Sequence, residues 1–435
     1  MSSMNAVAKQ SFGKRVVSAI VVALVTIGLL ELVVFLVFRP SMPGAEDEIP
    51  VAAVDSAAVR SSRERAGLGF RDPLMTLHPY LGYVFLPKDK RSPANPGHPA
   101  IAVSEDGFLD TQPAVRKRRP DRVIIGITGG SVSGQLGTWH AHHLATALQG
   151  LEAFQGRELE FVWLGMPGYH QPQQTIQLAY ILAQGGEFDY LINLDGFNEL
   201  AVPAALNAPQ GAHPLYPMNW SMVALDVPDA ELRRTIGAID YLRSERRTRN
   251  AAFAVSPWRV SPTFRWLHQR GDARLVAQLA AYAWQLQSHS LDEIPYFVSG
   301  PERLHVPLDD MVPELVAIWS RTSRQMNAMC TAFGIRYLHC LQPNQYDPGS
   351  KPLSRKEKEA AYEAQSPYRQ VVEKGYPQLR AAGSELRQAG IAFHDLSRVF
   401  ETSSATLYKD NCCHFNSEGN RILAEAIARA VETSY

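Results

Sequence analysis

Residues of the types that act together in acyl transfer are spread over this chain. Ser131 follows the stretch VIIGITGG at residues 123–130, and His414 lies in the segment DNCCHFNSEGN near the C-terminus. Asp410 precedes that histidine by four positions. A serine nucleophile needs an imidazole base, an acid that orients the imidazole, and donors for the oxyanion of the intermediate. The chain contains a serine, a histidine and an acid of these types. Whether they lie close together in space depends on the strands and helices that carry them.

The stretch before Ser131 has the pattern of a buried strand. Residues 123–127 (VIIGI) predict a strand covered on both faces, as in a parallel sheet. The glycines at 129–130 allow a sharp turn, and residues 138–148 have a helical pattern. Ser131 would then lie between a strand and a helix, where open α/β sheets bind ligands. The alternative is that Ser131 only caps the helix.

Strands and helices alternate along much of the remaining chain. Together with the first strand they predict an α/β fold, a flavodoxin-like doubly wound parallel sheet with three α/β/α layers. Asn416 or Ser417 would cap the last helix. The further strands are expected at 159–164, 190–194, 335–341 and 391–396, and the helices at 175–183, 355–364, 367–388 and 421–431.

Residues 16–38 form an apolar run that is long enough to cross a bilayer. Basic residues precede it and an acidic cluster follows at 46–48, which predicts a cytoplasmic N-terminus (residues 1–15) and an extracytoplasmic main domain, periplasmic in a bacterium. The run would anchor the chain in the inner membrane through a linker at 39–66. A cleaved signal peptide is the alternative, although its apolar core would be shorter. Glu31 would lie near the outer interface or contact another membrane helix.

The composition of the 435-residue chain fits a large globular domain, with 46% hydrophobic residues. Lys+Arg and Asp+Glu are equal at 43 each, so nothing indicates a nucleic-acid partner. Residues 67–120 alternate aromatics with Pro and Gly and predict an extension packed on the core. The core would span 121–435, with residues 201–325 as a helical insertion or lid.

The cysteines and the short motifs argue against a bound cofactor. Outside the cytoplasm a disulfide between Cys340 and either Cys412 or Cys413 is expected, and free buried thiols, with Cys330 among them, are the alternative. The cysteine spacing does not match a metal site. The chain also lacks HExxH, a P-loop and a dinucleotide fingerprint, so neither a metal nor an organic cofactor is expected.

Four short blocks resemble, in order, those of the SGNH (GDSL) hydrolase superfamily. In the first block Gly130 stands in place of the usual aspartate, a replacement frequent among membrane-anchored members. The resemblance covers residues 121–200 and 335–435. The matching blocks are GGS (129–131), PGY (167–169), GFNE (196–199) and DNCCH (410–414).

The resemblance implies a role for each matching residue. Ser131 would attack an ester carbonyl, and His414 would accept its proton while Asp410 orients the imidazole. The N–H groups of Ser131 and Gly168 and the side-chain amide of Asn198 would form the oxyanion hole.

The spacing in the last block departs from the family. The acid usually lies three residues before the histidine, where this chain has Asn411. Whether Asp410 or Asn411 faces His414 therefore stays open, and a one-residue bulge would let Asp410 do so.

The resemblance implies a serine-dependent esterase or O-acyltransferase that acts outside the cytoplasm on acylated glycans or related esters, with envelope proteins as partners. Hydrolysis and transfer use the same groups, so the sequence does not separate them. The alternative is a non-catalytic binding or assembly subunit of an envelope polysaccharide system. Gln342 and Asn344, at the end of the fourth core strand, would line the pocket.

Overall fold

The computed structural model describes residues 21–38 (apart from 24 and 27), 75–87, 102–220, 230–288 and 296–435. These residues fall into two units. One unit contains residues 21–38 and 230–288, and the other contains the rest. The expected cytoplasmic segment (1–15) and linker (39–66) lie outside the described residues.

The larger unit is built on a five-stranded parallel sheet with the order β4-β3-β5-β6-β7. This order confirms the flavodoxin-like doubly wound sheet, whose direction of winding switches between β3 and β5. The side chains of β3 are almost wholly buried, as the apolar pattern predicts. The strands are β3 (Arg122–Gly129), β4 (Glu158–Trp163), β5 (Tyr190–Asp195), β6 (Arg336–Leu341) and β7 (Ala392–Asp395).

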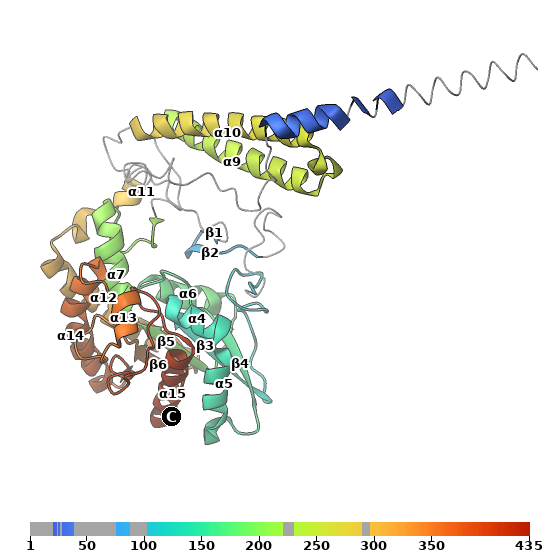
Figure 1. Ribbon diagram of the computed structural model, residues 1–435. Coiled ribbons are helices and arrows are strands. Elements are labelled where there is room, and N and C mark those ends of the chain that lie inside the picture. Colours follow the sequence, from blue (N-terminus) through green and yellow to red (C-terminus); the bar gives the residue numbers. More distant parts are fainter. Residues whose placement is uncertain are drawn as a thin grey trace, which may run out of the picture. The chain divides into compact units, whose positions relative to one another are not determined.

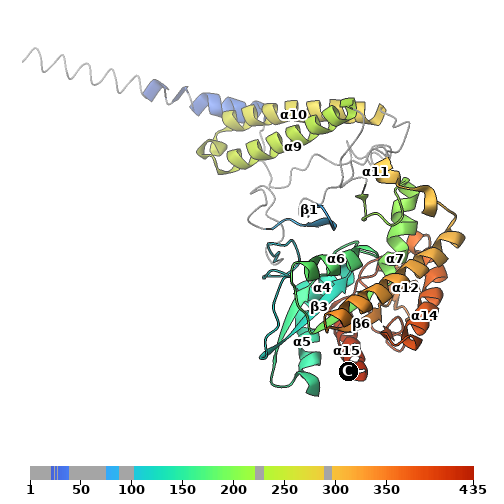
Figure 2. The same ribbon diagram turned by 180° about the vertical axis from the view of Figure 1, so that it is seen from behind.

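Helices cover both faces of the sheet (Figure 1). On one face α5 (Ala141–Gln149) packs against α15 (Ser417–Ser434). On the other face α12 (Leu308–Ala332) lies between α6 (Gln173–Ala183) and α14 (Pro367–Gln388), as the reverse view in Figure 2 also shows. The shorter helices are α4 (Ser131–Trp139), α7 (Phe197–Ala201), α11 (Tyr296–Ser299) and α13 (Arg355–Ala360).

The helix expected at 138–148 is wrong in its extent. Two helices occupy this region, because α4 begins at Ser131 itself and His140 separates it from α5 with a non-helical φ of −131°. The glycines in α4 are poor helix formers and hide its pattern in the sequence. Gly137 is needed for packing, since a Cβ atom there would lie 2.4 Å from the indole of Trp163.

The N-terminal extension contributes a small antiparallel hairpin, β1 (Met75–His78) and β2 (Gly82–Phe85). Tyr83 of β2 is buried, packs edge-on against Tyr169 at 5.4 Å between ring centroids, and donates to the carbonyl of Pro167 at 2.6 Å. The extension therefore reaches the loop after β4, which carries the second of the four blocks.

In the residues that the structure describes, the smaller unit contains three long helices and a short 3-10 helix at Pro257–Val260. Val21–Phe38, here called the anchor helix, is long and apolar enough to cross a membrane. The helices α9 (Ala230–Val255) and α10 (Pro262–Ser288) form an antiparallel hairpin. Within the hairpin, Arg246 of α9 donates to both carboxylate oxygens of Asp272 in α10, at 2.6 and 2.9 Å.

Candidate active site

Ser131 and His414 meet at the carboxyl edge of the sheet. Ser131 is the first residue of α4, directly after the turn that ends β3. His414 lies in the loop that precedes α15, 283 positions further along the chain. The Nε2 atom of His414 is 2.7 Å from Ser131 Oγ, which is an ordinary hydrogen-bond distance. The serine therefore has an imidazole base within reach.

Asp410 supplies the acid, and its turn explains the unusual spacing. Its Oδ2 atom is 2.6 Å from His414 Nδ1. Its Oδ1 atom accepts hydrogen bonds from the backbone N–H groups of residues 412–414 at 3.0 to 3.3 Å. One oxygen thus closes the turn while the other holds the imidazole. Asn411 is directed elsewhere, with its Nδ2 atom 3.0 Å from Glu363 Oε2.

The environment of Asp410 favours its charged form. Burial alone would raise the pKa of this carboxyl, but the hydrogen bond from His414 and those from the backbone N–H groups hold the pKa below its usual value. A carboxylate at Nδ1 keeps the ring proton on that nitrogen. The lone pair of His414 Nε2 then faces Ser131, as a general base requires.

The segment after β6 fixes the loop that carries the acid and the base. Gln345, Asn344 and Tyr346 donate side-chain hydrogen bonds to the carbonyls of residues 410, 412 and 411 at 2.9 to 3.0 Å. The sequence placed Asn344 and Gln342 in the pocket. Asn344 instead holds the loop, and Gln342 is buried. Gln345 and Tyr346 were missed, although amide and phenol groups directly after a strand end were a readable signal.

Three groups are expected to hold the oxyanion. The amide of Ser131 lies at the N-terminus of α4, and that of Gly168 belongs to a residue with φ of 75°. Within the described part of the chain, neither amide donates a hydrogen bond. Asn198 Nδ2 donates to the carbonyl of Tyr169 at 2.9 Å, which leaves its second N–H for a ligand. An oxyanion site needs N–H groups of this kind.

Two residues that the sequence did not suggest border Gly168. A Cβ atom on Gly168 would lie 2.5 Å from Met218 Cε and 2.8 Å from the hydroxyl of Tyr83. Tyr83 comes from the N-terminal extension, and Met218 from the start of the predicted insertion. Nothing in the periodicity of either segment predicts these contacts. They place the Met218 side chain and the Tyr83 ring beside Gly168.

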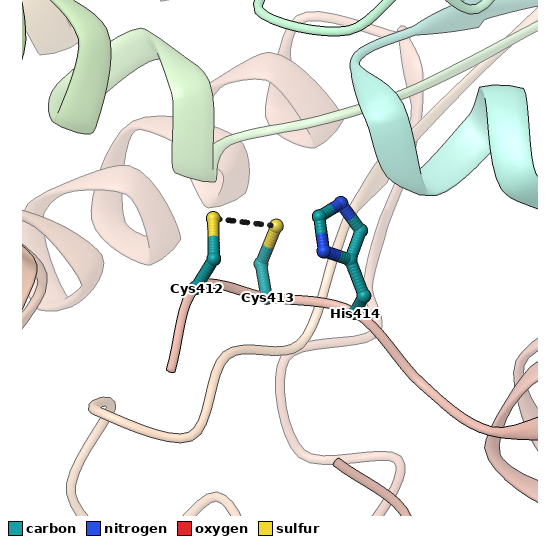
Figure 3. A group of neighbouring side chains, drawn as sticks. All are labelled: Cys412, Cys413 and His414. Carbon is teal, nitrogen blue, oxygen red and sulfur yellow. Dashed lines mark hydrogen bonds between the residues drawn. The ribbon is translucent and has the colours of Figure 1, made fainter. Parts of the chain in front are cut away.

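The two adjacent cysteines beside His414 are free thiols (Figure 3). Cys412 Sγ and Cys413 Sγ are 3.5 Å apart, much further than a disulfide bond allows. The expected disulfide of Cys340 with either of them is wrong, because Cys340 is also free and buried within β6. Burial raises the pKa of Cys413 well above its usual value, so this thiol stays protonated and is a poor nucleophile.

The thiols and the imidazole could also bind a metal ion. Ligand atoms of Cys412, Cys413 and His414 lie within 4.8 Å of one another. Both imidazole nitrogens, however, already contact Ser131 and Asp410. A metal on His414 would therefore compete with the hydrogen bonds of the serine site.

A second Ser–His–Asp chain lies inside the core. Ser323 Oγ is 2.8 Å from His339 Nδ1, and His339 Nε2 is 2.8 Å from Asp195 Oδ1, which also accepts from Trp319 at 2.7 Å. All of these side chains are buried, so no substrate reaches this serine. The sequence does not reveal this network, because its members come from three separate segments and no motif marks them.

Glu199 connects the core to the donor Asn198. Its side chain is buried and accepts hydrogen bonds from the amide of Gly196 at 2.6 Å and from Gln174 Nε2 at 3.0 Å. Burial, with the charge of Asp195, raises the pKa of Glu199 well above its usual value. Glu199 therefore fixes the turn into α7.

Comparisons with known proteins give little beyond the geometry. No protein-family model matches the chain, and no curated protein matches it. One similar solved structure is a "putative acylhydrolase" from Bacteroides fragilis, with 8% identity and a TM-score of 0.32 over 74% of this chain and 91% of that one. Another is LAE5, an alpha/beta hydrolase enzyme from the metagenome of Lake Arreo, Spain, with 15% identity and a TM-score of 0.30 over 72% of this chain and 96% of that one.

Proposed function

We propose that this protein is an SGNH-type serine hydrolase, an esterase or O-acyltransferase that uses Ser131, His414 and Asp410. The observation that carries the proposal is the continuous hydrogen-bond chain of 2.7 and 2.6 Å through these residues. The buried Ser323–His339–Asp195 chain shows that a serine, a histidine and an aspartate in hydrogen-bond contact do not by themselves make a site that a substrate can reach. Ser131 differs because, among the described residues, its own backbone N–H group and that of Gly168 donate to no acceptor.

The proposed reaction has two halves. Ser131 Oγ attacks the ester carbonyl while His414 Nε2 takes the hydroxyl proton. The oxyanion accepts hydrogen bonds from the N–H groups of Ser131 and Gly168 and from Asn198 Nδ2. The intermediate collapses, and the leaving alcohol takes the proton from His414. In the second half His414 deprotonates water or an acceptor hydroxyl, which attacks the acyl-serine. The C–O bond to Ser131 then breaks, His414 returns the proton to Ser131 Oγ, and the acid or new ester is released.

The anchor helix supports an extracytoplasmic role. We propose that the N-terminus is cytoplasmic and that the main domain acts on acylated glycans or related esters of the cell envelope, with envelope proteins as partners. The non-catalytic alternative drew support from the shifted acid. Because Asp410 reaches His414, that support is lost.

Labelling with a fluorophosphonate probe tests the proposal on the full chain in detergent, since only an activated serine reacts. We expect wild type to be labelled and to hydrolyse p-nitrophenyl acetate, and Ser131→Ala to lose both. Ser323→Ala is the matched control and should keep the labelling. Absence of labelling in the folded wild type, or labelling that survives in Ser131→Ala, would overturn the assignment. Product analysis with added glycan acceptors then separates transfer from hydrolysis.

A further inference from the structure

Glu31, the acidic residue of the anchor helix, contacts the start of α10. Its carboxylate accepts a hydrogen bond from Ser261 Oγ at 2.6 Å and from the backbone N–H of Thr263 at 3.0 Å. A carboxylate at a helix N-terminus is favourable because unpaired N–H groups point toward it. Glu31 thus has a helix partner within this chain, and its depth in a membrane, near the outer interface or not, stays a prediction.

A second contact sets the direction of the two helices. Phe38 of the anchor helix packs against Trp266 of α10, with ring centroids 4.9 Å apart. Moving from Glu31 to Phe38 along the anchor helix corresponds to moving from Thr263 to Trp266 along α10. The two helices therefore run side by side in the same direction, as both views show (Figures 1 and 2).

The turn between α9 and α10 exposes large apolar side chains. Within residues 255–267, here called the hairpin tip, five such side chains are exposed to solvent. The exposed fractions are 84% for Val255, 60% for Trp258, 74% for Val260, 41% for Phe264 and 51% for Leu267. A dense exposed apolar patch of this kind marks a surface that another apolar phase covers.

We propose that the hairpin tip inserts into the outer leaflet of the bilayer that holds the anchor helix. This inference rests on the anchoring proposed above. Glu31 lies seven residues before Phe38, which is about 10 Å along a helix. If the span ends near Phe38, the partners of Glu31 lie about 10 Å below the outer interface, in the range of about 5–10 Å in which interfacial helices bury their apolar face.

The charges at the tip limit how deep it reaches. Arg265 interacts electrostatically with Glu31. Arg259 is exposed, and its guanidinium donates to the carbonyl of Ala254 at 2.9 Å. Arginine side chains near an interface direct their heads toward the phosphates while their stems stay in the apolar region. Trp258 is of the type that is enriched at that level of the bilayer. Phospholipid is therefore the occupant that fits the tip.

Quenching of tryptophan fluorescence by brominated phosphatidylcholine tests the insertion. The full chain is reconstituted into vesicles of ordinary or brominated lipid, and wild type is compared with Trp258→Phe. We expect brominated lipid to quench part of the wild-type emission and Trp258→Phe to lose that part. Trp284→Phe is the matched control, because Trp284 is 72% exposed on the same hairpin but about 27 Å from Trp266 along α10. The Trp284-dependent emission should be the same in both lipids.

A second variant tests the role of Glu31, and extraction separates the two proposals. Glu31→Ala should reduce the Trp258-dependent quenching, because it removes the acceptor for Ser261 and Thr263. If alkaline carbonate releases the full chain from the vesicles, the anchoring itself is wrong. If the chain resists extraction but its Trp258 emission is equal in both lipids, the tip does not insert and the inference is overturned. Labelling of Ser131 is independent of both outcomes.

Discussion

A Cβ atom on Gly130 would lie 2.3 Å from the side-chain nitrogen of Asn198. The φ of Gly130 is −87°, which any residue can adopt, so the backbone does not demand glycine here. Glycine is required instead because the side-chain amide of Asn198 occupies the space that a Cβ atom would need. Gly130 is therefore matched to Asn198, and the segments at 129–131 and 196–199 lie together.

Gly130→Ala should lower kcat by displacing Asn198 from the oxyanion. Removing one such donor costs roughly 3 kcal/mol, or about a hundredfold in kcat. Asn198→Ala should have a similar effect, and the double variant should be no worse than either single one, because both remove the same interaction. Steady-state kinetics on p-nitrophenyl acetate measure this cycle. Additive losses would show that Gly130 and Asn198 act separately.

Asp410→Asn should lower kcat by about 10⁴ without abolishing it, because the amide favours the wrong imidazole tautomer. Asn411→Ala is the control, since the Asn411 side chain contacts Glu363 rather than His414. We expect this control to keep kcat within a few-fold of wild type. The opposite ranking of the two variants would assign the acid to position 411.

Loss of the charge on Asp410 should affect the pH profile only at strongly acid pH. Burial would raise the pKa of this carboxyl, but the hydrogen bonds from His414 and from the backbone N–H groups hold the pKa below its usual value of 3.8. A loss of kcat/KM that is caused by protonation of Asp410 is therefore expected only below that pH, and it should be absent from the profile of Asp410→Asn. A loss above pH 3.8 that occurs in wild type but not in Asp410→Asn would contradict the lowered pKa.

A buried ion pair holds the segment that leads into the DNCCH loop. Lys351 Nζ is 2.9 Å from Glu357 Oε2, and both side chains are fully buried. Glu357 Oε1 accepts from the amides of Leu407 and Tyr408 at 2.8 and 3.0 Å. Lys351→Met should lower the free energy of unfolding by about 3–5 kcal/mol, since it leaves a buried carboxylate without its cation. Arg355→Met, which breaks an exposed pair with Glu359 on the same helix, should change stability little.

Urea unfolding of the full chain in detergent measures both variants, and pH adds a second readout. Burial would raise the pKa of Glu357, but the hydrogen bonds from Leu407 and Lys351 lower it overall. A lowered folded-state pKa contributes stability above the unfolded value of 4.5, and this contribution is lost as pH falls through the folded value. The difference between Lys351→Met and wild type should therefore shrink toward acid. A difference that is constant with pH would exclude Glu357 as its source.

Much of the fold could be predicted because it rests on local patterns. The apolar runs of β3 and β5 and the amphipathic α14 follow directly from the periodicity of their residues. The convergence of Ser131 with His414 follows from the parallel sheet, which brings strand ends to one edge.

The parts that could not be predicted depend on contacts between distant segments. Gln345 and Tyr346 hold the carbonyls of the loop at 410–412 through single hydrogen bonds, which leave no periodic trace in the sequence. The disulfide prediction was wrong because the sequence does not show how far Cys340 lies from Cys412 and Cys413 in space. The extent of α4 was misjudged because its glycines serve packing rather than helix propensity.

The distance of 283 positions between Ser131 and His414 has a consequence for the synthesis of this protein. The ribosome makes Ser131 283 residues before it makes His414. A chain that is truncated before residue 414 therefore carries a serine hydroxyl of ordinary reactivity. The nascent protein therefore lacks the contact between Ser131 and His414 until the segment that carries His414 has folded back onto the sheet.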